Sequence, residues 1–498
     1  MALDTARQAN PAPPSQPRGP AQRWPALAAA GLRAAVFSAY AVAVAAVAQR
    51  HEPWFDEAQA WLLARDESLW HLLVHQMRYE GSPPLWHLLL MGPAQLGAPY
   101  PTLEAIAVVI AILGAYVLVR FSPFPLPLTV GVLFSFVVAY QYAVVARSYV
   151  LLPPLLFCLA LTWTRRLRDP WPFALVLTLL ALTSTHGLLV AGSVFAVHML
   201  QAWRPIDGVG LRPSARRAHL RGGLVFVVVC GLVVAQLWPA PDQSLGAGFN
   251  PDPRNLALVA PAVLSSALTG SPPLSLAAVA LSALWFRRTR TLLLWTLPTL
   301  ALLTLAAVKY HSYWHDGIPF LVWIFALWVS FAQGPVGAAR NRDRWLRLGA
   351  CLAMGGVLVV QSVWWWQTVR HDWVYPYSGS QQLAAWLERQ PPSTEIAAIG
   401  FHALGALPYL DRNVYANLNG GRRPAAMHWS TTPRLVDDVW SVWLTRPDVI
   451  VWSVKSRRAL TEPALPGYDR VAVFEGDLYW KNRAIERDAF YVFRLGQP

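Results

Sequence analysis

Twelve apolar segments recur along most of this 498-residue chain, and they limit its fold more than any other feature. A straight helix needs about 20 apolar residues to cross the hydrocarbon core of a bilayer. Only 14% of the residues are charged, whereas water-soluble proteins carry about 25%. The pattern therefore predicts a polytopic α-helical membrane protein with about eleven to thirteen spans. The segments lie near 26–48, 84–97, 102–119, 125–146, 148–164, 171–185, 187–203, 223–239, 256–286, 291–308, 317–332 and 348–366.

Clusters of arginine separate several of these segments, and the positive-inside rule places such clusters in the cytoplasm. The N-terminus is then cytoplasmic, while the loop at 49–86 and everything after Arg370 are extracytoplasmic. Because the basic residues sit in short groups between apolar runs, the net charge of +14 does not indicate nucleic-acid binding. The clusters are Arg165, Arg166 and Arg168; Arg204, Arg212, Arg216, Arg217 and Arg221; Arg287, Arg288 and Arg290; and Arg340, Arg342, Arg344 and Arg347.

The composition divides the chain into three parts. Residues 1–25 are rich in Pro, Ala, Gln and Arg and predict a disordered cytoplasmic tail, and residues 26–370 predict the membrane domain. The predicted N-terminus is cytoplasmic and the predicted C-terminal domain is extracytoplasmic, so the number of segments that cross the membrane must be odd. We therefore expect Pro84–Leu96 and Leu256–Leu268 to lie at the interface or dip into it rather than cross. Residues 371–498 predict a small extracytoplasmic α/β domain, with strands in TEIAAIGF, DVIVWSV, YDRVAVFEG and AFYVFRL and a Ser-capped helix in SGSQQLAAWLERQPP.

The loop after the first apolar segment is rich in acids. If residues 55–65 are helical, an apolar face of Phe55, Ala58, Trp61 and Leu62 predicts a helix that lies flat at the interface. Adjacent residues project about 100° apart on a helix, so Asp56 and Glu57 cannot both point into one cavity. The alternative reading is that the acids only keep an exposed loop soluble. Between His51 and Trp86 the acids are Glu52, Asp56, Glu57, Asp66, Glu67 and Glu80.

The order of these features resembles the GT-C superfamily. A first span is followed by an Asp-Glu pair that opens the loop helix, and then by Glu80 and the turn Pro83-Pro84-Leu85-Trp86. ARSY at 146–149, Thr-His at 185–186 and KYHSYWHDGIP at 309–319 resemble further landmarks of the superfamily. Its members are polytopic glycosyltransferases that use polyprenyl-phosphate sugars. The layout of roughly residues 26–335 is most similar to the branch with protein mannosyltransferases and lipid A aminoarabinose transferases.

The resemblance implies sugar transfer from a polyprenyl-phosphate donor to a glycan, lipid or protein acceptor, among membrane lipids. It implies that Asp56 is the catalytic carboxylate, and a carboxylate suits the removal of a proton from an attacking hydroxyl. A single displacement inverts the anomeric carbon. Glu57 and Glu80 are further candidates, and Glu80 could instead bind the acceptor, sugar hydroxyls or a divalent cation. Relatives often carry His where this chain has Ser82, so a His ligand for a metal is missing at this position. A divalent cation is therefore left open, and the resemblance implies no other cofactor.

A donor phosphate at the membrane surface needs a cation. Arg147, at the mouth of a predicted span, is the first candidate, and snorkelling to the interface is its alternative role. Family members often carry Arg-Tyr where this chain has Lys309 and Tyr310. The remaining candidates are Lys309, His311 and His315 at the phosphate, and His186, Tyr310 and Tyr313 as residues that line the site.

Two other function classes remain open at this point. A transporter or flippase of a lipid-linked or polar substrate would carry ionisable residues in mid-span and show two related halves. The charges here lie mostly at span ends, and no internal repeat is evident. A non-catalytic scaffold would use the C-terminal domain to hold a partner. The short loops and compact soluble domain favour the inner membrane of a bacterium as the location.

Overall fold

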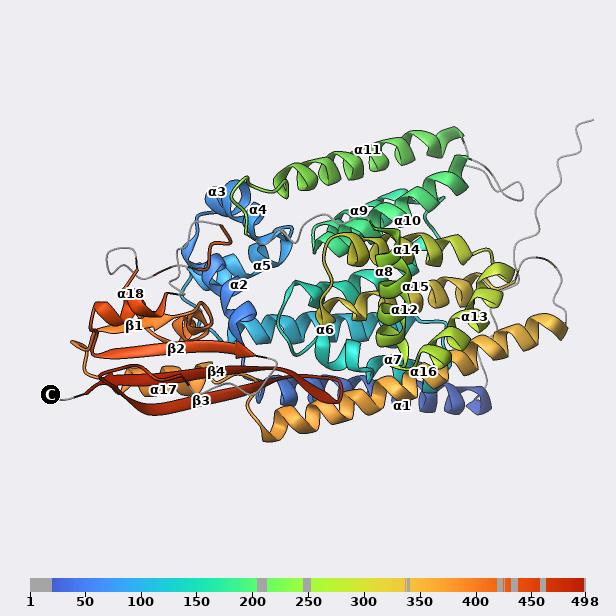
Figure 1. Cartoon of the computed structure of the whole chain (residues 1–498). Coiled ribbons are helices and arrows are strands. Elements are labelled where there is room, and N and C mark those ends of the chain that lie inside the picture. Colours follow the sequence, from blue (N-terminus) through green and yellow to red (C-terminus); the bar gives the residue numbers. More distant parts are fainter. Residues whose placement is uncertain are drawn as a thin grey trace, which may run out of the picture.

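A helical part and a small C-terminal sheet lie end to end along the length of the molecule (Figure 1). The computed structural model describes residues 20–203, 213–244, 252–335, 337, 341–418, 424, 426–430, 438–456 and 463–496. The predicted fold class, a polytopic helical protein with a C-terminal α/β domain, is confirmed. Most of the predicted tail and Arg204, Arg212 and Arg340 lie outside the described residues, and the first helix already begins at Pro20.

The helical part follows the predicted apolar segments. Its elements are α1 (Pro20–Ala48), α2 (Phe55–Asp66), α3 (Leu69–His71), η1 (Leu72–Gln76), α4 (Met77–Glu80), α5 (Leu85–Gln95), α6 (Thr102–Phe121), α7 (Leu126–Leu133), η2 (Val137–Gln141), η3 (Ser148–Leu151), α8 (Leu152–Trp163), α9 (Pro170–Ala181), α10 (Thr185–Trp203), α11 (Pro213–Gln236), α12 (Pro253–Leu268), α13 (Pro272–Arg288), α14 (Leu292–Val308), η5 (Tyr313–His315), α15 (Gly317–Gln333) and α16 (Asn341–Val374).

Fewer helices are long enough to cross a bilayer than the predicted eleven to thirteen spans. Six helices of the described chain meet that length and hydropathy, or seven if α12 and α13 form one span that is bent by 83°. The bend agrees with the expectation that 256–268 does not cross as a straight helix. The segment predicted at 84–96 forms only the 11-residue helix α5. Helices α8, α9 and α14 are apolar but shorter than a straight span needs.

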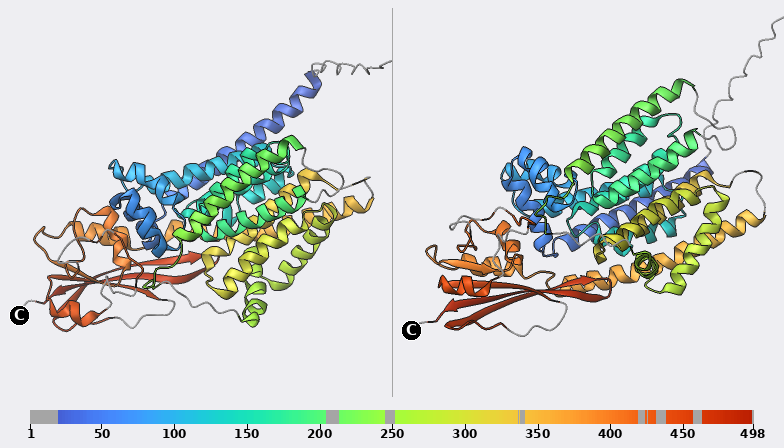
Figure 2. Two further views of the ribbon diagram at one scale, coloured as in Figure 1. Left: turned by 90° about the horizontal axis from the view of Figure 1, so that it is seen from above. Right: turned by 45° about the horizontal axis from the view of Figure 1, so that its top comes forward.

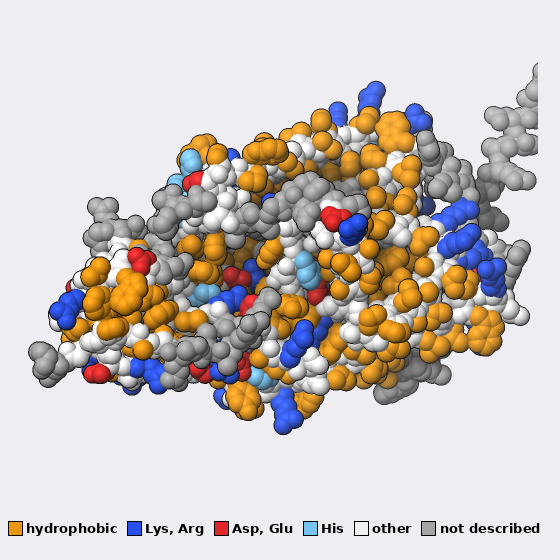
Figure 3. Space-filling model, viewed as in Figure 1, with side chains coloured by type: hydrophobic (Ala, Val, Ile, Leu, Met, Phe, Trp, Pro, Cys, Tyr) orange, Lys and Arg blue, Asp and Glu red, His pale blue; other side chains and the backbone are white. Residues whose placement is uncertain are grey.

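The arginine clusters mark the end of the helical part that lies away from the sheet. Basic side chains gather at that end, and hydrophobic side chains cover much of the surface between it and the sheet (Figure 3). Two helices that carry these clusters are joined there. Arg288 at the end of α13 pairs with Asp343 at the start of α16, with N–O distances of 2.6 and 2.9 Å. The sequence thus places its basic and acidic loops at opposite ends of the bundle, as the topology argument requires.

The C-terminal domain contains a four-stranded sheet in the order β1-β2-β4-β3. The predicted strands are confirmed as β1 (Ile396–Ile399), β2 (Val449–Ser456), β3 (Tyr468–Trp480) and β4 (Arg483–Leu495). Strand β1 pairs parallel with β2, and all other pairs are antiparallel. The predicted helix α17 (Ser380–Glu388) follows Gly379, so the expected serine is not its N-cap residue. The 3₁₀-helix η6 (His402–Tyr409) and α18 (Val439–Leu444) complete the domain.

The sheet domain is interlocked with the helical part. The β3–β4 hairpin packs along α16 (Figure 2). At its tip, Lys481 donates a hydrogen bond to the backbone oxygen of Ser266 in α12, and its ammonium group lies 4.2 Å from the Trp364 ring centroid. Thr368 of α16 donates to the Lys481 carbonyl over 2.8 Å. These contacts fix the sheet against the end of the bundle that carries the acidic loop.

The loop helix predicted at 55–65 exists, but its predicted position is wrong. Helix α2 packs against α5 on one side and against η6 of the C-terminal domain on the other. Nine of its twelve residues are buried, and they lie on all faces of the helix. The C-terminal domain covers the face that would have met the membrane surface, so α2 is a core helix rather than an interfacial one.

Candidate functional site

A large cavity lies between the acidic loop, the bundle and the C-terminal domain, with a volume of about 920 Å³. Figure 3 shows acidic, basic and histidine side chains in a hollow between the sheet and the helices. All the predicted site residues except Glu57 line this cavity. These residues are Asp56, Glu80, Arg147, His186, Lys309, Tyr310, His311, Tyr313 and His315. The structure therefore brings together side chains from four separate stretches of the sequence.

Asp56 and Arg147 form an ion pair on the wall of the cavity. Asp56 stands in the first turn of α2, and Arg147 directly precedes η3. Arg147 Nη1 lies 2.7 Å from Asp56 Oδ2, and each side chain keeps about a quarter of its surface exposed, at 26% and 24%. The guanidinium group also lies over the Tyr149 ring, 5.5 Å from its centroid. This charge-assisted pair is open to the cavity, so a ligand can reach both groups.

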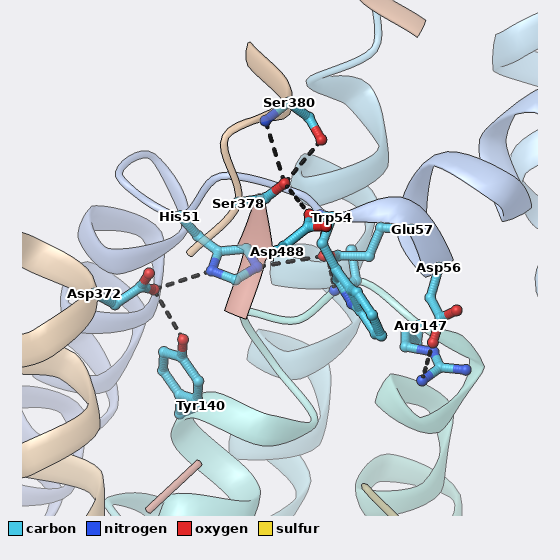
Figure 4. A network of polar contacts seen from close by, with 11 residues as sticks. His51, Trp54, Asp56, Glu57, Tyr140, Arg147, Asp372, Ser378, Ser380 and Asp488 are labelled. Carbon is cyan, nitrogen blue, oxygen red and sulfur yellow. Dashed lines mark hydrogen bonds and ion pairs between the residues drawn. The ribbon is translucent and has the colours of Figure 1, made fainter. Parts of the chain in front are cut away.

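Glu57 points the other way and is fully buried. Its carboxylate accepts hydrogen bonds from the backbone N–H groups of Ala146, over 2.6 Å, and Trp54, over 3.2 Å. Its third partner is His51, whose Nε2 lies 3.4 Å away. Figure 4 shows Asp56 and Glu57 on different sides of the α2 N-terminus. The two acids do diverge as predicted, but the second one enters the protein core instead of the solvent. Glu57 holds the backbone that immediately precedes Arg147.

A buried histidine links this glutamate to α16. His51 Nδ1 hydrogen-bonds to Asp372 Oδ2 over 3.0 Å, and the Tyr140 hydroxyl donates to the same oxygen over 3.0 Å (Figure 4). Burial alone would lower the pKa of His51, but the carboxylates of Asp372 and Glu57 raise it well above its usual value. A cationic imidazole between two carboxylates is paired on both sides, which offsets the cost of burying its charge. We name His51, Glu57, Asp372 and Tyr140 the buried network.

Glu80 lies on the cavity wall beside the C-terminal domain. Its Oε1 accepts a hydrogen bond from Gln59 over 2.9 Å, and Gln59 also bonds to both backbone groups of Met427, over 2.7 and 2.8 Å. Burial raises the pKa of Glu80 to about 7, the hydrogen bond from Gln59 lowers it, and the charge of Asp56 raises it further. An acid poised near neutral pH in a cavity is typical of a functional site.

The raised pKa of Glu80 predicts a pH effect on stability. The native state holds this proton from the ordinary value of 4.5 up to about 7, so its contribution to stability falls as the pH rises through that window. Glu80→Gln cannot ionise and should flatten the decline, by at most about 3 kcal/mol. Thermal unfolding of the purified protein between pH 5 and 8 measures this effect. The exposed acid Asp66 provides the control Asp66→Asn, and equal slopes in Glu80→Gln and the wild type would contradict the prediction.

The opposite wall carries histidines and tyrosines from the loop before α15. His315 Nε2 lies 2.9 Å from the Tyr149 hydroxyl, and its ring centroid lies 4.1 Å from that of His186, with the two rings tilted by 38°. His311 Nε2 lies 2.7 Å from Asp316 Oδ1, and Asp316 also accepts a hydrogen bond from Ser266 over 2.5 Å. The Ser266 hydroxyl in turn accepts a hydrogen bond from Lys481 at the hairpin tip. The hairpin of the C-terminal domain thus braces one wall of the cavity.

Several residues that face the cavity were not found from the sequence. They belong to the C-terminal domain and comprise Phe401, His402, Trp429, Lys455, Ile485 and Glu486. No motif marks them, because they come from four separate stretches of the domain. Only the folded arrangement of β2, β4, η6 and the loop at Trp429 brings them together. For the metal that the sequence left unknown, no group of three or more His, Cys, Asp or Glu side chains suited to an ion occurs in the described ranges.

No family model matches the chain, and no curated protein matches it. A solved structure does: ArnT from Cupriavidus metallidurans in the apo state superimposes with a TM-score of 0.51 at 12% sequence identity. The match covers 95% of this chain and 98% of that one. The chain has the ArnT fold. The likeness extends over the helical part and the C-terminal domain together, so it accounts for the whole architecture. The GT-C fold expected from the Asp-Glu pair and the Pro-Pro-Leu-Trp turn is thereby confirmed.

Proposed function

We propose that this protein is an integral membrane glycosyltransferase that moves a sugar from a polyprenyl-phosphate donor to an acceptor hydroxyl. The observation that carries the proposal is the Asp56–Arg147 pair, at 2.7 Å, on the wall of a large cavity in an ArnT-like fold. The pair supplies the two functions that such a transfer needs, a group that accepts a proton and a cation that binds a phosphate.

The chemistry can be written with these two residues alone. The acceptor oxygen forms a bond to the anomeric carbon and gives its proton to the carboxylate of Asp56. The bond between the anomeric carbon and the phosphate oxygen breaks, and its electron pair leaves with the lipid phosphate. The guanidinium of Arg147 stabilises the negative charge that develops there. One displacement of this kind inverts the anomeric centre.

The ion pair also suggests an order of events. Without a donor, Asp56 neutralises Arg147. A donor phosphate competes for the same guanidinium, because phosphate and carboxylate bind arginine in the same forked geometry. Binding of the donor therefore releases Asp56 from its partner and leaves it able to accept a proton. Lys309, His311 and His315 stand on the same cavity and would face the remaining phosphate oxygens.

The location follows from the same arrangement. The cavity opens at the end of the bundle opposite the basic side chains (Figure 3). With the arginine clusters in the cytoplasm, the cavity and the C-terminal domain face the extracytoplasmic side of a bacterial inner membrane. The apolar helices beside the cavity would accommodate the polyprenyl chain.

The direct test uses purified full-length protein in lipid nanodiscs. Undecaprenyl-phosphate monosaccharides with the label in the sugar are supplied as a panel (glucose, mannose, galactose, arabinose and 4-amino-4-deoxyarabinose). We expect release of undecaprenyl phosphate from at least one of them, with the sugar transferred to an acceptor or to water. Intact donor with the whole panel would refute the proposal, and movement of intact donor across proteoliposomes would identify a transporter.

Arg147 provides a prediction on the donor side. Arg147→Lys keeps a positive charge but loses the planar fork, so kcat/KM for the donor should fall about 10- to 100-fold. Arg65 is the matched control, because it also pairs with an aspartate, Asp66, over 2.6 Å on the last turn of α2. Arg65→Lys should keep wild-type kinetics. A normal kcat/KM in Arg147→Lys would remove this residue from the donor site.

A further inference from the structure

The C-terminal domain places a second acid–base pair on the cavity. His402 begins η6, and its Nδ1 lies 3.0 Å from Oδ1 of Asp488 on β4. The carboxylate of Asp488 is fully buried, and its other oxygen accepts a hydrogen bond from Ser378 over 3.0 Å. A buried carboxylate that is bonded in this way keeps the proton of a neutral imidazole on Nδ1. The lone pair of Nε2 is then left for another partner.

That second nitrogen is available to a ligand. His402 lines the cavity, and no side chain or backbone group of the described residues hydrogen-bonds to its Nε2. The histidine is also held firmly in place. Its helix η6 packs on α2, and a Cβ on Gly405 would come within 2.5 Å of Ser380 Oγ. The His402 ring centroid lies 5.2 Å from that of Phe55, the residue before Asp56.

Aromatic side chains surround this position. The rings of Phe55 and Phe401 lie 4.9 Å apart, and Trp429 lies 5.3 Å from Phe401 and 6.0 Å from Phe55. All three side chains line the cavity. We name Phe55, Phe401 and Trp429 the aromatic cluster. Beside it, Lys455 of β2 pairs with Glu486 of β4 over 2.7 Å. Apolar rings with a few fixed polar groups are the usual composition of a small-molecule subsite.

We propose that His402, oriented by Asp488, and the aromatic cluster form the acceptor subsite, and that this subsite takes a carbohydrate. The inference rests on the proposed function and adds the acceptor class to it. One sugar hydroxyl donates a hydrogen bond to His402 Nε2. The C–H groups of the sugar's apolar face lie against the aromatic rings, whose π faces carry partial negative charge. His402 thus binds the acceptor next to Asp56, and Asp488 is its positioning residue.

The position of the strands favours a carbohydrate over an extended peptide. A peptide that binds beside a sheet adds a strand to a free edge and uses main-chain hydrogen bonds. Lys455 stands on β2, an inner strand that pairs with β4 over Val449–Ser456 and Arg487–Arg494, and Glu486 directly precedes the paired part of β4. At Lys455 this wall of the cavity therefore offers a side chain rather than a free strand edge. Side-chain recognition by rings and isolated polar groups suits the hydroxyls and apolar face of a sugar.

The test compares transfer with donor hydrolysis in the full-length protein in nanodiscs. The donor is the labelled undecaprenyl-phosphate sugar that the wild type cleaves. The acceptors are octyl glycosides of glucose, galactose, mannose and N-acetylglucosamine, set against a peptide that contains serine and threonine. The variants are His402→Gln, Asp488→Asn and Phe401→Leu. Glu475→Gln on β3, outside the cavity lining, is the control.

We expect the wild type to glycosylate at least one octyl glycoside and not the peptide. The loss of one hydrogen bond in His402→Gln or Asp488→Asn should raise the KM for that glycoside about 5- to 10-fold. Phe401→Leu should raise it several-fold, by loss of the ring face. The ratio of glycoside transfer to donor hydrolysis should therefore fall in all three, whereas Glu475→Gln should keep the wild-type ratio and both wild-type rates. A misfolded variant would instead lose transfer and hydrolysis to the same extent.

Three results would overturn the inference. An unchanged KM for the glycoside in His402→Gln with normal hydrolysis would exclude His402. Transfer to the peptide in place of the glycosides would mean that the acceptor is a polypeptide rather than a carbohydrate. Donor cleavage without transfer to any glycoside would also reject the acceptor class. A wild type that cleaves no donor at all would instead refute the proposed function, so the two failures are distinguishable.

Discussion

Replacing Asp56 with asparagine should lower sugar transfer by about 100- to 10,000-fold, the range that a positioned general base contributes. Asparagine has the size of aspartate and can still accept a hydrogen bond from Arg147, so the cavity should keep its shape. It cannot take a proton at neutral pH. Transfer and donor hydrolysis should fall together, because water and a sugar hydroxyl both need the same base. The initial rate of undecaprenyl phosphate release measures the effect.

The matched control lies at the other end of the same helix. Asp66 pairs with Arg65 over 2.6 Å and does not line the cavity. Asp66→Asn should therefore keep wild-type activity, and both variants should unfold at nearly the wild-type temperature. Normal activity in well-folded Asp56→Asn would exclude this residue as the base. Attention would then move to Glu80, another acid on the cavity.

The fold could be predicted from the sequence because its signals are local. An apolar segment predicts a helix from its own residues, and the alternating pattern of apolar and polar residues after residue 371 predicts the strands of a sheet. The number of spans could not be predicted with the same success, because it depends on the length of each straight helix. The long apolar run near 256–286 breaks at Gly270 into α12 and α13, which meet at 83°. A run of residues shows that a segment is apolar, but a single glycine with a positive φ decides whether it is straight.

The site could be predicted only where one stretch of sequence carries the signal. Asp56 of the Asp-Glu pair, ARSY and the loop from Lys309 supply residues that do meet at one cavity. His402 and Asp488 are 86 positions apart, and neither belongs to a motif. The burial of α2 was missed for the same reason. An amphipathic helix shows an apolar face, but nothing in its own residues says whether lipid or a distant domain covers that face.

The replacement of Glu57 should give the largest loss of stability. Glu57→Ala leaves the cationic His51 with one carboxylate and leaves the N–H group of Ala146 without its acceptor. Breaking a buried charge pair from one side costs about 3–5 kcal/mol. The backbone before Arg147 would also lose its contact with α2, so the Asp56–Arg147 distance would vary. We expect a lower unfolding temperature and, in the fraction that remains folded, a lower kcat/KM for the donor.

The conservative variant separates positioning from catalysis. Glu57→Gln keeps an oxygen that can accept from Ala146 but loses the negative charge beside His51. Its activity should stay within about tenfold of the wild type, far above that of Asp56→Asn. Glu67→Gln, which changes a partly buried acid paired with the exposed His71 over 2.6 Å, is the control. A loss in Glu57→Gln as deep as that in Asp56→Asn would make Glu57 a catalytic acid.

The pH dependence of the same variant identifies the group that Glu57 acts on. The pKa of His51 is raised well above its usual value in the native state. Its charge therefore stabilises the fold at low and neutral pH, and this contribution is lost as the pH rises through the native pKa. Glu57→Gln removes one of the two carboxylates that raise the pKa, so the alkaline loss of stability should begin at lower pH. Thermal unfolding from pH 6 to 10 would show the shift, and parallel curves would mean that Asp372 alone holds the charge of His51.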